Sequence, residues 1–497
     1  MVCPAHDAAA EPLQPGGVDR CAAAGVGADQ LSDRPGAPDR DAQPRSGRAP
    51  GRARRSKATG KLLVRVVFFT HSFAPDYTGG AEVSLYHTCR GLQARGVDCV
   101  VLNVAAKHAR PDDRWHEVDG IPVRRITLAT RWPNHYLDLF DPRVFVAVRR
   151  ELTQLRPDLL HAHNVARASL APLVAARATR TPTVLTLHDL WLLCPNGMRY
   201  QADGTFCDPR RWPDGCGNCF RRYEHWADLP RRRRWMMALT RNVARFISPS
   251  QALIDRHVEA GFDPARFRLV TYGLAEPALA PPQHPGVQAV CATAHTRPTL
   301  AFAGGGVEIK GAKVVQAALP KLLDALPDLQ LAVAGWGDPD ILRGYNRFGD
   351  AVRMLGSVPF LEMRALFGAA DLSLVASVWH ENSPVVIYEN FQMGTPVVGS
   401  ALGGTPELID EGRTGYLFAP GAADQLAAKV VQHFQRPTWE RRQMRHACVQ
   451  KARGDLSLQA HLDQTQAVYA EVLAAHGLGT AKLDAKRVRG GAWGRAG

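Results

Sequence analysis

The sequence predicts an α/β protein with two domains, each built on a parallel sheet that helices cover. Short apolar stretches alternate with amphipathic helical stretches, and this alternation is typical of parallel sheets. The alternation occurs in two series, over residues 62–275 and again over residues 298–476. A proline-rich segment, residues 276–297, separates the two series, and we interpret it as a linker between domains.

The first series begins with a buried strand in residues 63–70, "LVRVVFFT". Residues 79–96 then contain a glycine turn, a helix and a glycine stop, and residues 98–104 form the next strand. Two further strands, in residues 159–164 and 183–189, end in histidine. The second series begins near Pro298, with strands in "TLAFAGG", "LQLAVAG", "DLSLVAS" and "TPVVGS". Ligands of open parallel sheets bind at the carboxyl ends of the strands, where the glycine and polar residues of this chain collect.

The composition is that of a globular protein, with 497 residues, 45% of them hydrophobic and 22% charged. Residues 1–61 and 477–497 are exceptions, and we expect both segments to be disordered. The chain has no apolar run of the ~18 residues that suggest a spanning helix. Residues 1–25 lack the pattern of a secretory signal. We therefore expect a cytoplasmic protein, soluble or peripheral at the inner membrane face. The net charge of +14 favours anionic partners, which include nucleic acid, acidic lipid and phosphorylated small molecules.

Two glycine turns are candidate phosphate sites. Gly79 and Gly80 lie between a strand and a helix, where backbone can approach a ligand and free N–H groups favour an anion. Gly304 to Gly306 follow a strand of the second series, and Lys310 can neutralise a phosphate there as a point charge. The alternatives are an ordinary tight turn and a solvated lysine at a helix start. The spacing excludes a P-loop.

His188 ends a strand of the first domain and precedes Asp189. A histidine in this place can point into the cleft and donate a hydrogen bond to a sugar. The alternative is a histidine that packs under a loop. His161 and His163 end a neighbouring strand, and we favour a structural role for both.

Residues 379–407 hold two carboxylates around a helix start. Ser383 is a good N-cap and Pro384 suits the first helical position. Glu381 then precedes the helix, and Glu389 lies roughly 8 Å along its axis. A ligand with hydroxyls at each end and phosphate in the middle matches this arrangement, because carboxylates accept from hydroxyls and helix starts bind anions. That ligand is a nucleotide-sugar. The alternative, two surface acids, fits poorly because the segment between them is apolar.

These residues resemble the signature of retaining glycosyltransferases of family 4, which have the GT-B fold: two Rossmann-like domains whose parallel sheets face a central cleft. Glu381 and Glu389 match the E-x7-E pattern of that family. The resemblance extends over about residues 64–475 and rests on further motifs in the family's order: "GGAE", "LHAHN", "TLHD", "SPSQ", "IKG", "AGWGD", "LGSV", "GGTPELI" and "GRTGYLF".

The resemblance implies roles for individual residues. It assigns the donor sugar to Glu381 and His188, the ribose to Glu389, and the diphosphate to Lys310 with the Gly79–Gly80 loop. His188, Glu381 and Lys310 are then the catalytic group. The remaining donor-binding residues are Gly304, Gly305, Ser383, Val385 and Val386. The implied mechanism is a front-face transfer with retention, without a divalent metal and with no cofactor required for catalysis, in which the leaving phosphate helps to deprotonate the acceptor.

The sequence departs from the family in two places. Many relatives carry arginine where this chain has Gly305, so one of the usual phosphate charges is missing, and Arg245 is one candidate to replace it. The family's Asn-Gly at the domain junction is Tyr272-Gly273 here.

Two features lie outside the family pattern. Cys194, Cys207, Cys216 and Cys219 cluster in residues 194–219, and four thiolates with this spacing are candidate ligands for a structural zinc; free thiols and redox use are the alternatives. Residues 231–246 form a basic, apolar helix candidate that either lies on a membrane surface or packs Trp235, Leu239 and Val243 inward.

The sequence therefore predicts a transferase that moves a sugar from a nucleoside diphosphate to a glycan, lipid-linked or small-molecule acceptor. Two other functions fit part of the sequence. A nucleic-acid-binding protein explains the charge but not the paired glutamates. The other is a related enzyme that hydrolyses or epimerises nucleotide-sugars, and analysis of the reaction products distinguishes it from a transferase. The sugar, the base and the acceptor do not follow from the sequence.

Overall fold

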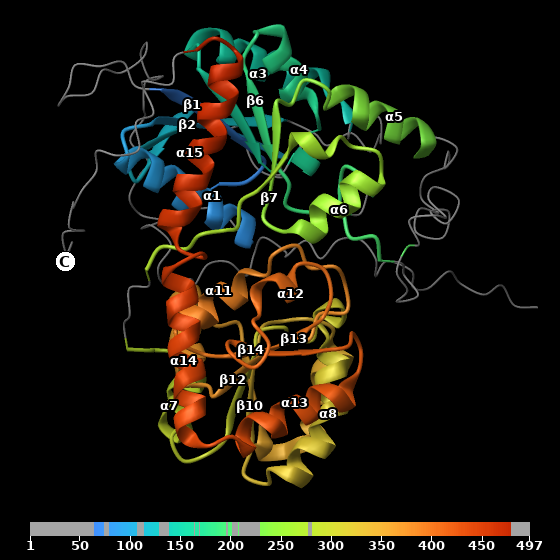
Figure 1. Ribbon diagram of the computed structural model, residues 1–497, viewed down its shortest axis with the longest axis vertical. Helices are drawn as coiled ribbons and strands as arrows, with labels where there is room; N and C mark the ends of the chain where they lie inside the picture. The colour runs from blue at the N-terminus through green and yellow to red at the C-terminus, as the bar shows by residue number, and fades with distance from the viewer. Residues whose placement is uncertain are drawn as a thin grey trace, which may run out of the picture.

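The computed structural model describes residues 64–73, 79–106, 114–128, 139–163, 165–167, 169–194, 197–200, 207, 229–276 and 281–478. Two α/β domains lie one above the other along the longest axis of the molecule (Figure 1). Each domain has its own sheet, with helices on both faces. In the described ranges, no helix combines the length and the apolar composition needed to cross a bilayer.

The sheet of the first domain has the strand order β3-β4-β2-β1-β5-β6-β7-β8. Among the described strands of this sheet, only β3 runs antiparallel to its neighbour, β4, while the other pairs are parallel. The strands are β1 (Arg65–Thr70), β2 (Asp98–Ala106), β3 (Trp115–Val118), β4 (Ile121–Leu128), β5 (Leu159–His163), β6 (Thr183–Thr186), β7 (Arg245–Ser248) and β8 (Phe267–Leu269).

Successive apolar side chains of these strands point to opposite faces and build two cores. Phe69 belongs to the core under α3 and α4, while Phe68 belongs to the core under α1. Because both faces are buried, the strands read as nearly continuous apolar runs. The described helices of this domain are α1 (Gly80–Ala94), α3 (Pro142–Leu155), α4 (Ala171–Ala178), α5 (Leu229–Leu239) and α6 (Gln251–Glu259).

The sheet of the second domain is parallel, with the order β11-β10-β9-β12-β13-β14. Its strands are β9 (Thr299–Phe302), β10 (Gln330–Ala334), β11 (Val352–Gly356), β12 (Leu372–Val375), β13 (Val397–Ser400) and β14 (Gly415–Phe418). Its helices are α7 (Pro285–Thr293), α8 (Ala312–Ala325), α9 (Pro339–Gly344), α10 (Phe360–Ala369), α11 (Val385–Gln392), α12 (Thr405–Leu408), α13 (Ala423–Gln435) and α14 (Thr438–Arg453). The sequence-based expectation of two parallel-sheet α/β domains is confirmed.

The structure differs from the expected linker 276–297. Residues Pro285–Thr293 form α7, which begins at an N-cap, His284, whose ring accepts a hydrogen bond from the Val287 amide. Val287 and Val290 are fully buried in a core shared with α10. Proline in the first turn of a helix made this segment resemble a linker in the sequence.

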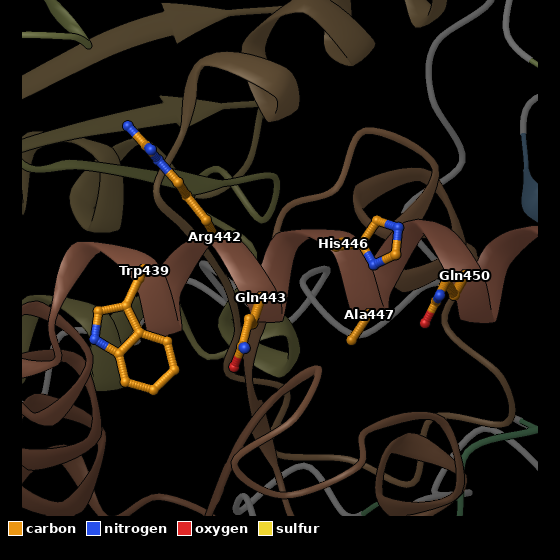
Figure 2. Close-up of a pocket in the computed structure, with 6 residues that line it drawn as sticks. All are labelled: Trp439, Arg442, Gln443, His446, Ala447 and Gln450. Atoms are coloured by element: carbon orange, nitrogen blue, oxygen red, sulfur yellow. The ribbon is translucent and has the colours of Figure 1, made fainter.

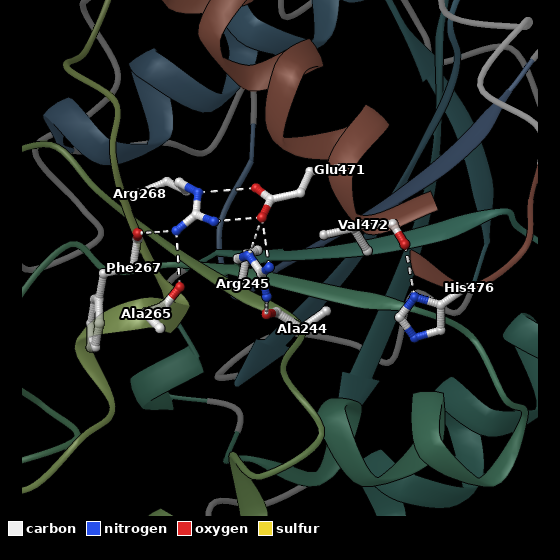
Figure 3. A network of polar contacts seen from close by, with 8 residues as sticks. All are labelled: Ala244, Arg245, Ala265, Phe267, Arg268, Glu471, Val472 and His476. Carbon is white, nitrogen blue, oxygen red and sulfur yellow. Dashed lines mark hydrogen bonds and ion pairs between the residues drawn. The ribbon is translucent and has the colours of Figure 1, made fainter. Parts of the chain in front are cut away.

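The last helix, α15 (Leu458–Ala475), belongs to the first domain rather than to the second. The chain returns from α14, and α15 packs against α1, with Leu462 and Tyr469 buried in the core of the first sheet (Figure 1). Glu471 accepts hydrogen bonds from both Arg245 and Arg268 at the end of that sheet (Figure 3). The sequence-based range 298–476 had placed this helix with the second domain.

Candidate active site

A narrow pocket opens where the two domains meet. The first domain lines it with His188, Asp189 and Arg256, and the second domain lines it with residues 379–382 and Gly403. The carboxyl ends of strands from both sheets supply these positions, since His188 follows β6 and residues 379–382 follow β12. The pocket therefore brings together two of the three residues that the sequence predicted to be catalytic, His188 and Glu381.

Direct hydrogen bonds hold the two walls of this pocket together. The Ser250 hydroxyl donates to Asn382 Oδ1 at 2.6 Å, and Asn382 Nδ2 donates to the Leu187 carbonyl at 3.3 Å. The carboxylate of Glu407 accepts from the first two backbone amides of α6, each at 2.7 Å. A carboxylate at a helix start is favoured by the free N–H groups and by the helix dipole. No local pattern around Glu407 indicates that it joins the domains, because this contact depends on their relative placement.

Glu381 is buried, with 8% of its surface exposed. Its Oε1 accepts three hydrogen bonds, from Lys310 Nζ at 2.6 Å, Ser377 Oγ at 2.9 Å and Trp379 Nε1 at 3.0 Å. The other carboxylate oxygen makes no hydrogen bond to the described residues. Since Glu381 lines the pocket, this oxygen is available to accept from a ligand hydroxyl.

Lys310 reaches Glu381 because the backbone turns sharply after it. Gly311 has a φ of +85°, and a Cβ there would lie 1.9 Å from the Ala376 carbonyl oxygen. Only glycine allows this approach, which seats Lys310 beside the end of β12. The ammonium lies 5.4 Å from the centre of the Trp379 ring, and 41% of the side-chain surface remains exposed. A cation that is anchored on one side and open on the other can meet a phosphate.

The helix start in the signature differs slightly from the sequence-based assignment. Pro384 rather than Ser383 is the N-cap, and α11 begins at Val385. The Ser383 hydroxyl bonds Tyr388 Oη at 2.7 Å, so it is not used to cap the helix. Gly80 approaches this same turn from the first domain, since a Cβ on Gly80 would lie 2.7 Å from Val385 Cγ2. The two predicted phosphate elements, the glycine turn and the start of α11, therefore face each other across the domain boundary.

Glu389 lies on α11 and is also buried, with 8% of its surface exposed. Its carboxylate forms no hydrogen bond with the described residues. Burial raises the pKa of Glu389 to about 7, and the charge of Arg364 opposes that rise. A buried acid without a donor fits a position that a ligand hydroxyl completes.

We expect Glu389→Gln to stabilise the free protein at neutral pH. The pKa of Glu389 rises from 4.5 to about 7 on folding, so between these values the folded state binds more protons and wild-type stability falls as the pH rises. The neutral amide removes this penalty, which is on the order of 1–3 kcal/mol. Melting temperatures measured from pH 4 to pH 8 should separate in favour of the variant as the pH rises. Parallel curves would contradict the raised pKa.

His188 is held by both of its ring nitrogens. Nδ1 lies 2.7 Å from Tyr272 Oη, and Nε2 lies 3.0 Å from Nδ1 of His163. Burial, followed by the nearby His71, lowers the pKa of His188 to about 3, so the ring is neutral at physiological pH. His163 also approaches His161 at 3.4 Å, which makes the strand-end histidines one hydrogen-bonded group. With both nitrogens bonded, the His188 ring is held in one orientation and lines the pocket, and it is not placed to act as a nucleophile.

The glycine loop Gly304 to Gly306 packs against a second glycine turn. Gly305 has a φ of +52°, and a Cβ there would lie 2.3 Å from the Trp336 carbonyl oxygen. An arginine side chain has no room at this position, which accounts for the departure from the family pattern. Arg245 does not replace it, because that guanidinium is bound to Glu471. The pocket does contain Arg256, on α6, which sequence reasoning did not select.

The predicted cysteine cluster lies partly outside the described residues. Cys194 is buried and Cys207 is half-buried, whereas Cys216 and Cys219 lie outside the described residues. The described parts of the chain contain no group of three or more side chains suited to bind a metal.

A second depression lies on the outer surface of α14, and all of its lining residues come from that one helix (Figure 2). It contains none of the predicted site residues. Its walls carry the basic side chain of Arg442 and the ring of His446 but no carboxylate, so it has no counterpart of the paired acids.

Comparison with known proteins gives the same relationship over both domains. The profile of Glycosyltransferase Family 4 matches residues 78–274, and that of Glycosyl transferases group 1 matches residues 297–436. The phosphatidyl-myo-inositol mannosyltransferase of Mycobacterium tuberculosis is 33% identical over 123 residues, which are 24% of this chain and 32% of that protein. The chain thus spans about a third of the length of the mannosyltransferases it matches. Glycogen synthase of the same organism is 24% identical over 432 residues, covering 82% of this chain and 94% of that protein.

Solved structures agree in fold. The Anabaena protein HepE, in complex with UDP-glucose, superposes with a TM-score of 0.59 at 19% identity over 82% of this chain and 99% of that chain. Sucrose-phosphate synthase of Thermosynechococcus elongatus superposes with a TM-score of 0.61 at 19% identity over 83% and 100%. The fold and the interdomain site define a protein of the GT-B class. The chain belongs to glycosyltransferase family 4.

Proposed function

We propose that this protein transfers a sugar from a nucleoside diphosphate sugar to a glycan, lipid-linked or small-molecule acceptor, with retention of the anomeric configuration. The proposal rests on one observation: Glu381, the start of α11 and the buried Glu389 follow one another along the chain, and Lys310 is bound to Glu381. The chain therefore presents a carboxylate paired with a cation, then an anion-binding helix start, and then a second carboxylate. A sugar, a diphosphate and a ribose have the complementary order.

In this proposal each group of the donor meets a suitable partner. The open oxygen of Glu381 accepts from a sugar hydroxyl, and the free amides at the start of α11 receive the diphosphate with Lys310. Glu389 accepts from the ribose, which supplies the hydrogen bond that its buried carboxylate lacks. Gly80 approaches the start of α11 from the other domain, so domain closure completes the diphosphate site.

The bond between the anomeric carbon and the phosphate oxygen breaks as the acceptor oxygen forms a bond on the same face. The acceptor proton passes to the departing phosphate oxygen, so no protein base is needed. Lys310 and the helix amides stabilise the negative charge that develops on the diphosphate. The proposal assigns this charge to protein groups alone and requires no divalent metal. The neutral ring of His188, whose two nitrogens already have partners, packs against the sugar.

We propose that the acceptor binds to the first domain. The named activity of the mycobacterial relative, a phosphatidyl-myo-inositol mannosyltransferase, supports a lipid-linked acceptor.

On α5, Trp235 has 55% of its surface exposed beside the exposed Arg234, whereas the inward-packing alternative required this tryptophan to be buried. Val243 is buried as expected. These features support peripheral contact with an acidic membrane, and liposomes with and without acidic lipid should differ in their capture of the protein if that contact forms.

The donor assignment predicts which ligands bind and which residue controls them. We expect nucleoside diphosphates to raise the melting temperature of the wild-type protein, because a ligand that binds only the folded state stabilises it. Glu389→Ala should abolish most of that shift and reduce sugar transfer by about 10- to 100-fold, the loss of one hydrogen bond to a charged acceptor. Product analysis with a panel of nucleotide-sugars reports transfer, hydrolysis or epimerisation. Unchanged turnover by the variant would contradict the assignment.

A further inference from the structure

Arg364 is a buried cation for which the described residues provide no hydrogen-bond partner. It lies on α10 with only 4% of its surface exposed, and its Nε has no partner among the described residues. Other buried arginines of the described chain are paired: Arg65 bonds Asp98, Arg124 bonds Glu151, and Arg232 bonds two backbone carbonyls. An unpaired buried charge is costly, and the usual exceptions are groups that a ligand completes.

The surroundings of Arg364 place it at one end of the proposed donor site. It interacts electrostatically with Glu389, the acid assigned to the ribose, and with His87 on α1 of the opposite domain. Its guanidinium lies 5.2 Å from the centre of the Phe360 ring, which supports the planar group from one side. Arg364 and Glu389 form no direct ion pair within the described residues. Neither group has a hydrogen-bond partner among the described residues, so one molecule that accepts from Arg364 and donates to Glu389 would complete both.

We propose that Arg364 contacts the nucleobase of the donor and selects guanine. This inference rests on the proposed function, because it takes the nucleoside end of the donor to lie at Glu389. The ribose hydroxyls donate to Glu389, and the base attached to that ribose continues beyond the acid toward Arg364.

The geometry of arginine decides between bases. Guanine presents O6 and N7 as two adjacent acceptors on one edge, and the fork of a guanidinium donates to both at once. The two carbonyls of uracil flank an N–H donor, so the same fork can use only one of them. Adenine presents one acceptor beside an amino donor. A buried guanidinium held against a phenylalanine is therefore better matched to guanine than to the other bases.

Isothermal titration of the full-length protein with GDP and with UDP tests the inference. We expect the wild-type protein to bind GDP about 10- to 100-fold more tightly than UDP, the range expected for one bidentate contact. Arg364→Met should lose most of this preference while it keeps its affinity for UDP within a few-fold. Arg364→Lys keeps the charge without the fork, so it should also lose most of the preference.

Arg347→Met is the matched control. Arg347 also lies over a phenylalanine ring, 4.7 Å from the centre of Phe348, but it is exposed, so its replacement should leave both affinities unchanged. Near-ultraviolet circular dichroism checks that each variant is folded, and Arg364→Lys carries the test if the methionine variant does not fold.

The outcomes separate the inference from the proposed function. Equal binding of GDP and UDP by the wild-type protein, a preference for UDP, or equal loss of both nucleotides in Arg364→Met would overturn the guanine assignment alone. The last result would mean that Arg364 acts only on the charge of Glu389. If the folded wild-type protein binds neither nucleotide, the proposed function itself fails.

Discussion

Lys310→Met should lower kcat for sugar transfer by about 10²- to 10³-fold, the range seen when one preorganised charge-stabilising group is removed. The ammonium is anchored to Glu381 at 2.6 Å and remains partly open on its other side. Its removal takes away the positive charge that we assign to the departing diphosphate. It also leaves a buried carboxylate without its counter-ion, so we expect the donor KM to rise as well. Steady-state kinetics with the identified donor measure both effects.

Lys313→Met is the control for this variant. Lys313 lies three residues further along and pairs with Glu308 at 2.6 Å, and both side chains are exposed. An exposed pair of this kind contributes little to stability, so the control should keep kcat within about two-fold of the wild type. A kcat for Lys310→Met within the same range as this control would remove Lys310 from the catalytic group.

Gly403→Ala should damage both stability and transfer, because this glycine touches the backbone of Glu381. Gly403 has a φ of +60°, and a Cβ there would lie 2.2 Å from the Glu381 carbonyl oxygen. The left-handed conformation and the overlap together should destabilise the protein by about 2–5 kcal/mol. A displacement of Glu381 by about 1 Å should reduce turnover by about 10²-fold. Thermal unfolding and donor turnover measure the two effects.

Gly421→Ala separates the backbone effect from the contact. Gly421 also has a positive φ, +77°, but a Cβ there would meet no atom within 4 Å. We expect a loss of about 1–2 kcal/mol in stability and no change in turnover. If Gly403→Ala behaves like this control, the close approach to Glu381 does not set the position of that acid.

The strands were predictable where apolar runs and glycine stops are strong, as in β1, β2 and β5, because both faces of each strand are buried. Prediction failed for segments whose contacts are with residues distant in the sequence. Ser383 has the composition of an N-cap, yet its hydroxyl bonds Tyr388 instead. The residues of α15 do not indicate which domain the helix packs against, because an amphipathic helix can pack on either sheet.

In the candidate site, too, features set by local sequence were predictable and features set by distant contacts were not. The spacing of Glu381 and Glu389 predicted two acids on either side of a helix start, because that spacing is local. Arg364 and Arg256 were not predicted, since neither carries a local signal and each becomes notable only through burial or through facing a pocket. The absence of arginine at Gly305 was visible in the sequence, but its cause, the backbone of Trp336, was not.

The return of α15 to the first domain gives the molecule two crossings between its domains, and these crossings touch. Leu274 forms a parallel bridge with Ser457, and a Cβ on Gly273 would lie 2.6 Å from the Cα of Leu458. Because the two crossings lie side by side, they form one narrow connection between the domains, and bending at this connection would move the Gly80 loop away from the start of α11.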